Sequence, residues 1–453
     1  MANTSAHNSP DSKLQTINEA LDTGSFQQAT RLINRGLPPS DIAHLIESSP
    51  PKERALIWRL VEQELRGEVL QSLSEDIQSF FLSKLNTQEV ISVTEDFDTD
   101  DLADILQQLP DTVTREVLDS MDSQDRQRVE AVLSYPEDTA GGLMNTDAVT
   151  IRADITLDVV LRYLRRHRSL PEMTDSLLIV SRRDELVGIL PITKLLVSNL
   201  GATVREVMET DTTSINVNMK DSDVANLFER QDLVSAPVVN SEGILLGRIT
   251  IDDVVDVIRE DADHSLMSMA GLDEEEDTFA PISQTAKRRA VWLGINLITA
   301  FIASFVIGLF ENTIRQVVAL AVLMPIVASM GGIAGSQTLT LVIRAMAVGQ
   351  ISKSNLSWLL NREFFVGLLN GILWSLVVSV AAVIWFQDLT IGIVIALAMI
   401  INLVVAAIAG TSLPIFLKSR NIDPALAGGV VLTTITDVVG FLSFLGLATI
   451  AYA

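Results

Sequence analysis

Five apolar stretches in the last third of the chain most constrain its fold. They lie at 290–310, 314–342, 364–385, 389–413 and 425–451. Each is close to the ~20 residues that a helix needs to cross a bilayer, and a helix satisfies its own backbone hydrogen bonds in hydrocarbon. We therefore predict a multi-pass membrane protein in which 285–453 forms a five-helix transmembrane bundle.

Charge is divided unevenly along the 453-residue chain, whose formal net charge is −24. From Ser283 onward, nine basic residues face five acidic ones, a net +4, so the preceding part carries −28. An acidic surface repels nucleic acid and anionic headgroups and attracts cations. We expect no nucleic-acid partner, and contact with membrane lipid through the apolar bundle. Hard cations such as Mg²⁺ prefer oxygen ligands, although acidic surfaces can also serve solubility alone.

The sequence disfavours a zinc or thiolate centre, because it has no cysteine and its four histidines share no ligand spacing. The polar segment 1–13 lacks the apolar core of a secretory signal and is expected to be a disordered leader.

Basic residues between the apolar stretches predict the orientation. They cluster in three places that alternate with poorly basic loops: Lys287, Arg288 and Arg289; Arg344, Lys353 and Arg362; Lys418 and Arg420. The positive-inside rule places these clusters and the N-terminal part in the cytoplasm. An odd number of spans leaves the C-terminus outside. The expected location is the inner (plasma) membrane.

One carboxylate lies in the interior of a predicted span: Asp437, with Thr433 and Thr436 nearby. Such a residue is by default a functional candidate. We interpret the three as a polar wall facing water, where carboxylates around an oligomer axis could hold a cation through its water shell. A protonated, structural aspartate is the alternative.

Glycines mark the second predicted span at positions 331, 332 and 335, after Pro325. They permit either close helix packing or a broken helix beside a pore. Pro414 predicts a further break in the fourth span.

The part before the bundle divides into three regions. Helical periodicity predicts an acidic all-helical domain at 14–136. Short Val/Ile strands alternate with helices over 137–257, where Leu186–Leu190 matches Leu245–Ile249 about 60 residues later. A connecting helix with an acidic loop, Asp273–Asp277, follows at 258–284.

The repeated region resembles a tandem pair of CBS motifs, which are α/β regulatory modules. Gly247, Thr250 and Asp253 look like the ribose-contacting turn of such modules, so ATP is a possible regulatory ligand. The first copy has Lys194 and no nearby aspartate at the matching place. A nucleotide-free role stays open.

Three motifs of the last third resemble the MgtE family of magnesium transporters. They are Leu323–Pro325 leading into Gly331–Thr338, the run Asp423–Ala427, and the Thr-Thr-x-x-Asp-x-x-Gly of Thr433–Gly440. The order of domains agrees along nearly the whole chain. The resemblance implies a homodimer with a pore on its axis, Mg²⁺ as substrate and regulator, and Asp437 as the ion-binding carboxylate.

The resemblance also implies an intracellular Mg²⁺ sensor that closes the pore when ions bridge acidic surfaces. The matching positions are Glu68, Asp100, Asp104, Asp232, Asp253, Asp256, Asp261 and Asp423. Asp100 and Asp104 are four residues apart on one helix face, where like charges destabilise unless a cation intervenes.

Two departures from the family pattern affect the gate and the sensor. Ile333 stands where the family usually has asparagine, in the Gly-rich gate segment with Gly331, Gly332 and Gly335. His264 and Ser265 stand where relatives often have acids. Open alternatives are transport of another divalent ion such as Co²⁺, gating mainly by nucleotide, and a membrane-anchored sensor that conducts nothing. No nucleophile–base set or phosphate loop predicts an enzyme.

Overall fold

The computed structural model describes residues 16–17, 25–95, 97–166, 170–171, 173–272, 278–352, 354–420 and 422–453. The predicted leader 1–13 and the acidic run 273–277 lie outside the described residues. The chain divides into two compact units, one made of 1–262 with 275–281 and the other of 263–274 with 282–453.

Short helices stacked on a common core form the first part of unit 1. They are α2 (Phe26–Gly36), α3 (Pro39–Glu47), α4 (Pro51–Leu60), α5 (Arg66–Gln71), α6 (Glu75–Leu82), α7 (Thr87–Val93), α8 (Thr99–Gln107), α9 (Asp111–Ser120) and α10 (Ser123–Val132), with the 3₁₀ turn η1 (Gln63–Leu65) before α5. Helices this short are marginal alone. Trp58 and Phe81, whose ring centroids are 4.6 Å apart, belong to the apolar core that holds several of them together.

Two copies of one α/β unit follow, as the sequence repeat predicted. The first contains β1 (Thr150–Ile151), α11 (Leu157–Leu164), β2 (Ser176–Val180), β3 (Leu186–Pro191) and α12 (Ile192–Val197); the second contains α13 (Val204–Val207), β4 (Ile215–Asn216), α14 (Asp221–Gln231), β5 (Ser235–Val239) and β6 (Leu245–Thr250). Each sheet has one parallel and one antiparallel pairing, in the orders β1-β2-β3 and β4-β5-β6.

The matching glycines of the repeat have a steric cause. A Cβ on Gly188 would lie 2.3 Å from the Glu209 carbonyl oxygen, and one on Gly247 would lie 2.6 Å from that of Asn145. In both copies, another backbone segment therefore crosses the last strand too closely for any other residue.

The helix α15 (Ile251–Met269) begins directly after β6 and includes the first part of the predicted connecting segment 258–284, but it begins earlier than that segment. The remaining helices are α16 (Ile282–Gly308), α17 (Glu311–Gln316), α18 (Ala319–Ala347), α19 (Leu356–Phe386), α20 (Leu389–Ser419) and α21 (Pro424–Ala451). All of these except α17 are long and apolar enough to cross a membrane, which agrees with the predicted five spans.

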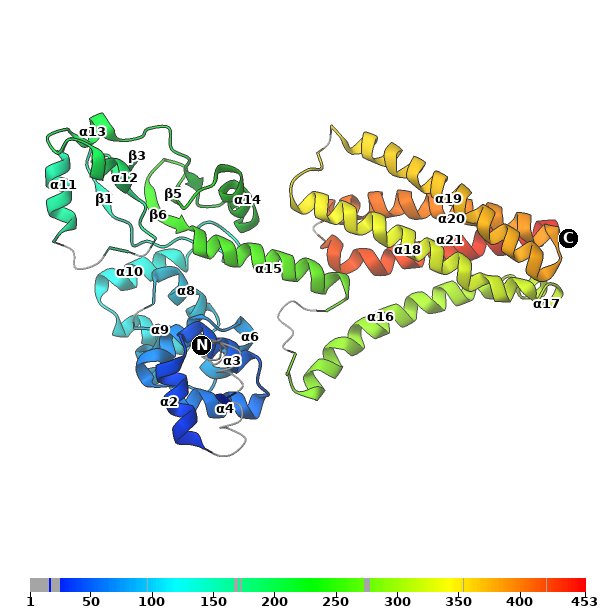
Figure 1. The fold of residues 1–453 in the computed structure, drawn as a ribbon, viewed down its shortest axis with the longest axis horizontal. Coiled ribbons are helices and arrows are strands. Elements are labelled where there is room, and N and C mark those ends of the chain that lie inside the picture. The colour runs from blue at the N-terminus through cyan, green and yellow to red at the C-terminus, as the bar shows by residue number, and fades with distance from the viewer. Residues whose placement is uncertain are drawn as a thin grey trace, which may run out of the picture. The chain divides into compact units, whose positions relative to one another are not determined.

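Helix α20 occupies the centre of unit 2, because it packs against α18, α19 and α21 (Figure 1). Pro325 and Pro414 lie inside continuous helices. The predicted break at Pro414 is therefore wrong, and the Gly-rich stretch does not interrupt α18. A proline removes only one backbone hydrogen bond, which neighbouring helices can compensate in a membrane bundle.

Candidate cation site

An acidic cavity of about 350 Å³ lies within unit 1. Its walls come from α6, α8, the start of α14, α15 and the loop that precedes the first CBS copy. Ten carboxyl groups line it: Glu75, Asp100, Asp101, Asp104, Glu137, Asp138, Asp221, Asp253, Asp256 and Glu260. The basic residue among its described lining is Arg259, which pairs with Asp256 at 3.7 Å. Negative charge in this cavity therefore greatly exceeds positive charge.

Two helix N-termini bring acids into the cavity. Asp100 and Asp101 lie in the first turn of α8, and Asp253 lies in the first turn of α15. The positive end of each helix dipole favours negative side chains at these positions. Asp253 is also held by Thr250, whose hydroxyl donates to its carboxylate at 3.0 Å and whose backbone N–H donates at 3.3 Å.

Several lining carboxyls have raised pKa values, because their negative charges are unfavourable in this cavity. Burial, followed by the charge of Asp253, raises the pKa of Asp100 well above its usual value. Burial, followed by Glu137 and then Asp101, raises the pKa of Asp104 to about 8. Burial also raises the pKa of Asp253 to about 7, with Asp252 adding to the effect. A divalent cation in the cavity would offset both the burial of these carboxylates and the repulsion between them.

A buried atom without a partner points to a ligand at the same place. Asp100 is 8% exposed, and its Oδ1 has no hydrogen-bond partner among the described residues. Asp98, Asp100 and Asp101 can each offer one oxygen within 4.8 Å of the others. Buried carboxylate oxygens are normally hydrogen-bonded or bound to a metal. Among these three, the buried Asp100 is therefore the strongest candidate for a cation ligand.

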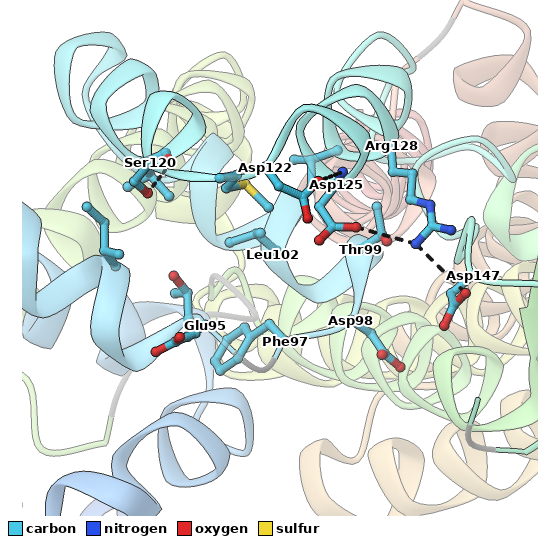
Figure 2. Close-up of a pocket in the computed structure, with 15 residues that line it drawn as sticks. Glu95, Phe97, Asp98, Thr99, Leu102, Ser120, Asp122, Asp125, Arg128 and Asp147 are labelled. Atoms are coloured by element: carbon cyan, nitrogen blue, oxygen red, sulfur yellow. Dashed lines mark hydrogen bonds and ion pairs between the residues drawn. The ribbon is translucent and has the colours of Figure 1, made fainter. Parts of the chain in front are cut away.

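A second cavity, of about 450 Å³, lies among α7, α8, α9 and α10 (Figure 2). Its acidic rim already has a counter-ion, because Arg128 lies 3.4 Å from Asp125 and 3.9 Å from Asp147. Asp98 lines this cavity, whereas Asp100 and Asp101 line the first. The carboxylate cluster thus lies between the two, and only the first cavity has such a large excess of acids.

The first cavity brings together four of the predicted sensor residues: Asp100, Asp104, Asp253 and Asp256. Glu68, Asp232 and Asp261 are exposed and are not among the described residues that line it. Sequence reasoning missed Glu260, although the spacing of 253, 256 and 260 places it on the same face of α15. It also missed Asp101, which follows Asp100 directly.

We predict that stability falls as pH rises when divalent cations are absent. Burial and nearby acids raise the pKa of Asp104 from 3.8 to about 8, so the native protein binds more protons than the unfolded chain between these pH values. The unfolding midpoint of the detergent-solubilised protein in EDTA should be about 2–4 °C lower at pH 8 than at pH 6. Asp104→Asn should reduce this difference, and a midpoint that rises with pH would contradict the prediction.

In unit 2, Asp437 is the fourteenth of the 28 residues of α21 and is half-buried. Thr433 is exposed on the same helix. Thr436 is fully buried, and its hydroxyl donates to the Thr433 carbonyl at 3.0 Å. The predicted polar wall is therefore wrong for Thr436, because the one-residue step of about 100° between Thr436 and Asp437 turns the Thr436 side chain towards the bundle interior.

The Gly-rich stretch of α18 has two different faces. Gly331 packs against Asn402, and Gly335 packs against Leu432, so these two glycines serve close helix packing. Gly332 has open space where a Cβ would be, and Ile333 is 55% exposed. Gly332, Ile333 and three polar residues, Ser336, Gln337 and Thr340, line a shallow hollow of about 550 Å³.

A second carboxylate lies inside a span that sequence analysis treated as uncharged. The helix begins earlier than predicted, so Glu363 is the eighth residue of α19 and is only 4% exposed. Arg362 pairs with it at 2.5 Å, and the Thr338 hydroxyl donates to it at 3.4 Å. These partners, close to the helix end, explain how the charge is tolerated.

Asp423 is already engaged by neighbouring groups in unit 2. Its carboxylate caps α21 by accepting from the backbone N–H groups of Ala425 and Leu426, at 2.9 and 3.1 Å. Nε2 of His264 also lies 3.1 Å from its Oδ2. The departure noted at His264 thus places an imidazole directly against a predicted metal ligand.

Comparison with known proteins decides the family. The MgtE divalent cation transporter family matches 324–447, its intracellular N domain matches 37–138, and the CBS domain family matches 140–199 and 204–260. The magnesium transporter MgtE of Bacillus subtilis is 30% identical over 415 residues, which are 91% of this chain and 92% of its own length. The chain belongs to the MgtE family.

A second MgtE protein matches nearly the whole chain, and a solved structure matches its cytosolic part. The magnesium transporter MgtE of Thermus thermophilus is 30% identical over 438 residues, 96% of this chain and 97% of its own. A crystal structure of the cytosolic domain of the Mg²⁺ channel MgtE in complex with ATP is 31% identical, with a TM-score of 0.49, and covers 54% of this chain and 99% of its own. The two full-length relatives are named as magnesium transporters.

Proposed function

We propose that this chain carries Mg²⁺ across the inner (plasma) membrane and closes when intracellular Mg²⁺ occupies the acidic cavity. The observation that carries the proposal is the excess of carboxylates in that cavity, with the unpartnered oxygen of Asp100 among them. The full-length relatives named as magnesium transporters support the choice of ion. Mg²⁺ also binds carboxylates while keeping several of its waters, which suits a cavity wider than a bare ion.

The proposed transport path uses Asp437, with Thr433 exposed one turn away. A half-buried carboxylate halfway along an apolar helix is costly unless it meets water or a cation. It would attract a hydrated divalent ion without stripping its water shell. Arg344, Lys418 and Arg420 near the ends of spans, together with Lys287–Arg289, support a cytoplasmic N-terminal part and an external C-terminus.

A homodimer with the pore on its axis is supported by the outward polar face of α18. Ser336, Gln337 and Thr340 are exposed beside Gly332 and Ile333. Exposed polar groups of a membrane span normally face protein or water. A second copy or an aqueous path would cover them, and Ile333 would then lie where the family pattern has a polar gate residue.

Regulation would follow from electrostatic repulsion within unit 1. When Mg²⁺ is scarce, the ten carboxyls repel one another across α6, α8, α14 and α15. When Mg²⁺ is abundant, ions bridge them and hold the connecting helix α15 in one arrangement. We propose Asp100, Asp104, Asp253 and Asp256 as principal ligands, with exposed Glu68, Asp232 and Asp261 as weaker ones. Asp423 would bind Mg²⁺ only after its contact with His264 opens.

ATP remains a proposed regulatory ligand of the second CBS copy, through Gly247, Thr250 and Asp253. Its ribose would compete with Thr250 for the carboxylate of Asp253, which also lines the acidic cavity. In the first copy, Lys194 is paired with Glu209 at 2.7 Å, which supports a single nucleotide site.

The test of the function is ion flux into proteoliposomes that contain the full chain. We expect Mg²⁺ influx, slower Ca²⁺ influx, and a lower Mg²⁺ rate when Mg²⁺ is present on the side of the acidic unit. A Co²⁺ rate well above the Mg²⁺ rate would favour the other-ion alternative. Absence of flux for all three ions would favour the non-conducting anchor and overturn the proposal.

A further inference from the structure

Asn402 is a buried polar residue at the centre of the bundle that the sequence analysis did not single out. It is the fourteenth of the 31 residues of α20 and is 1% exposed. Its Nδ2 donates to the backbone carbonyl of Val327 on α18 at 2.9 Å. Its Oδ1 is buried and has no hydrogen-bond partner among the described residues.

Two glycines on two other helices make room for this side chain. A Cβ on Gly331 of α18 would lie 2.3 Å from Nδ2 of Asn402, and one on Gly440 of α21 would lie 2.8 Å from the same atom. Real Cβ atoms do not approach so closely. The carboxamide is therefore enclosed between α18 and α21, and each helix has glycine where it passes.

Packing alone does not explain an asparagine here. Leucine has the same branching and would leave no polar atom without a partner in an apolar interior. What asparagine adds is one directional hydrogen bond to α18, at the cost of an unpaired carbonyl oxygen. That bond fixes both the rotation and the height of α20 against α18, which leucine would leave free to adjust.

The two glycines adjoin the residues of the proposed transport path. Gly440 lies three residues, slightly less than one turn, after Asp437 on α21. Gly331 directly precedes Gly332 and Ile333, which line the hollow on α18. A shift of α21 at Gly440 would also move Asp437, and a shift of α18 at Gly331 would also move Ile333. In each case the two residues lie within one turn of the same helix.

We propose that Asn402 is a positioning residue for ion transport, which sets the place of Asp437 relative to the Gly-rich segment of α18. The inference rests on the proposed function, because it takes Asp437 to lie on the ion path. It assigns α20, which carries no candidate ion ligand of its own, the role of holding α21, which carries Asp437, against the Gly-rich segment of α18.

Asn402→Leu separates positioning from packing. The variant keeps the side-chain shape and loses the bond to Val327. We expect its unfolding midpoint in detergent to stay near that of the wild type, while its Mg²⁺ to Co²⁺ rate ratio in proteoliposomes changes at least about tenfold, because a displacement of about 1 Å can have effects of this size. Wild-type rates and ion ratio in a folded Asn402→Leu protein would overturn the proposal.

A size-exchange pair tests the contact itself. Gly331→Ala should lower the unfolding midpoint and slow Mg²⁺ flux, since its methyl group would overlap Asn402. Adding Asn402→Ala should restore part of the lost stability, because it makes room for that methyl group. Gly294→Ala on α16, where a Cβ has nothing within 4 Å, is the matched control and should resemble wild type. If the double variant is no more stable than Gly331→Ala, the enclosed contact is wrong.

Failure of the proposed function would give a different result. Wild-type protein without Mg²⁺ flux would refute the proposed function, while the stability comparison would still test the contact between Gly331 and Asn402.

Discussion

Asp437→Asn should abolish Mg²⁺-dependent growth rescue in a bacterium that lacks its own Mg²⁺ transport. The substitution keeps the size and hydrogen-bonding capacity of the side chain and removes its charge. At the effective dielectric of partly buried sites, a carboxylate about 5 Å from a divalent ion contributes of order 3 kcal/mol or more. Its loss should lower the Mg²⁺ influx rate by at least about 100-fold.

The control for this result is Glu311→Gln. Glu311 is an exposed acid at the start of α17 that pairs with Arg315 at 2.5 Å, and its loss should leave growth rescue intact. Equal membrane abundance of the two variants, measured by immunoblot, excludes a folding defect. Full rescue by Asp437→Asn would remove Asp437 from the ion path.

The elements that sequence predicted best are those with a strong periodic or compositional signal. Five apolar stretches became five long helices, and the repeat around Gly188 and Gly247 became two sheets of equal topology. Helix ends were less predictable. The start of α19 lies eight residues before the predicted span, because its first two turns are more polar than the hydrocarbon-length core, and this error left Glu363 outside the bundle.

Sites that depend on three-dimensional contact were only partly predictable. The periodicity of α15 could have indicated Glu260, since it shares a face with Asp253 and Asp256. Glu137, Asp138 and Asp221 reach the same cavity from a loop and a helix start far away in sequence, so no local pattern indicates them. No local pattern indicates Asn402 either. A single asparagine in an apolar span is not informative until the structure shows that Gly331 and Gly440 pack against it.

The acidic cavity explains why two chemically similar aspartates should matter more together than separately. Asp100 lies on α8 and Asp253 on α15, and the charge of Asp253 is the second largest cause, after burial, of the raised pKa of Asp100. A bridging ion would bind both and thereby link the helical domain to the connecting helix. Neutralising only one of them leaves the other in place among the remaining acids of the cavity, where it can still attract Mg²⁺.

The double variant Asp100→Asn with Asp253→Asn should therefore uncouple transport from intracellular Mg²⁺. Asparagine at both positions removes the repulsion between Asp100 and Asp253 at low Mg²⁺ and the ionic bridge between them at high Mg²⁺, so both conditions should give similar flux. We expect the ratio of flux at low to high intracellular Mg²⁺ to fall about tenfold, a typical size for coupling between two sites. The measurement is Mg²⁺ influx into proteoliposomes with the Mg²⁺ concentration varied on the side of the acidic unit.

A control with the same change in net charge distinguishes the cavity from the general acidity of unit 1. Asp158→Asn with Glu242→Gln removes two exposed carboxylates from the CBS pair, outside the acidic cavity, and should leave the flux ratio unchanged. Limited proteolysis of the full chain adds a readout independent of flux: Mg²⁺ should protect the wild type and this control around α15, but not the Asp100/Asp253 variant. If both double variants lose Mg²⁺ regulation equally, sensing depends on the total charge of unit 1 and the cavity is not the sensor.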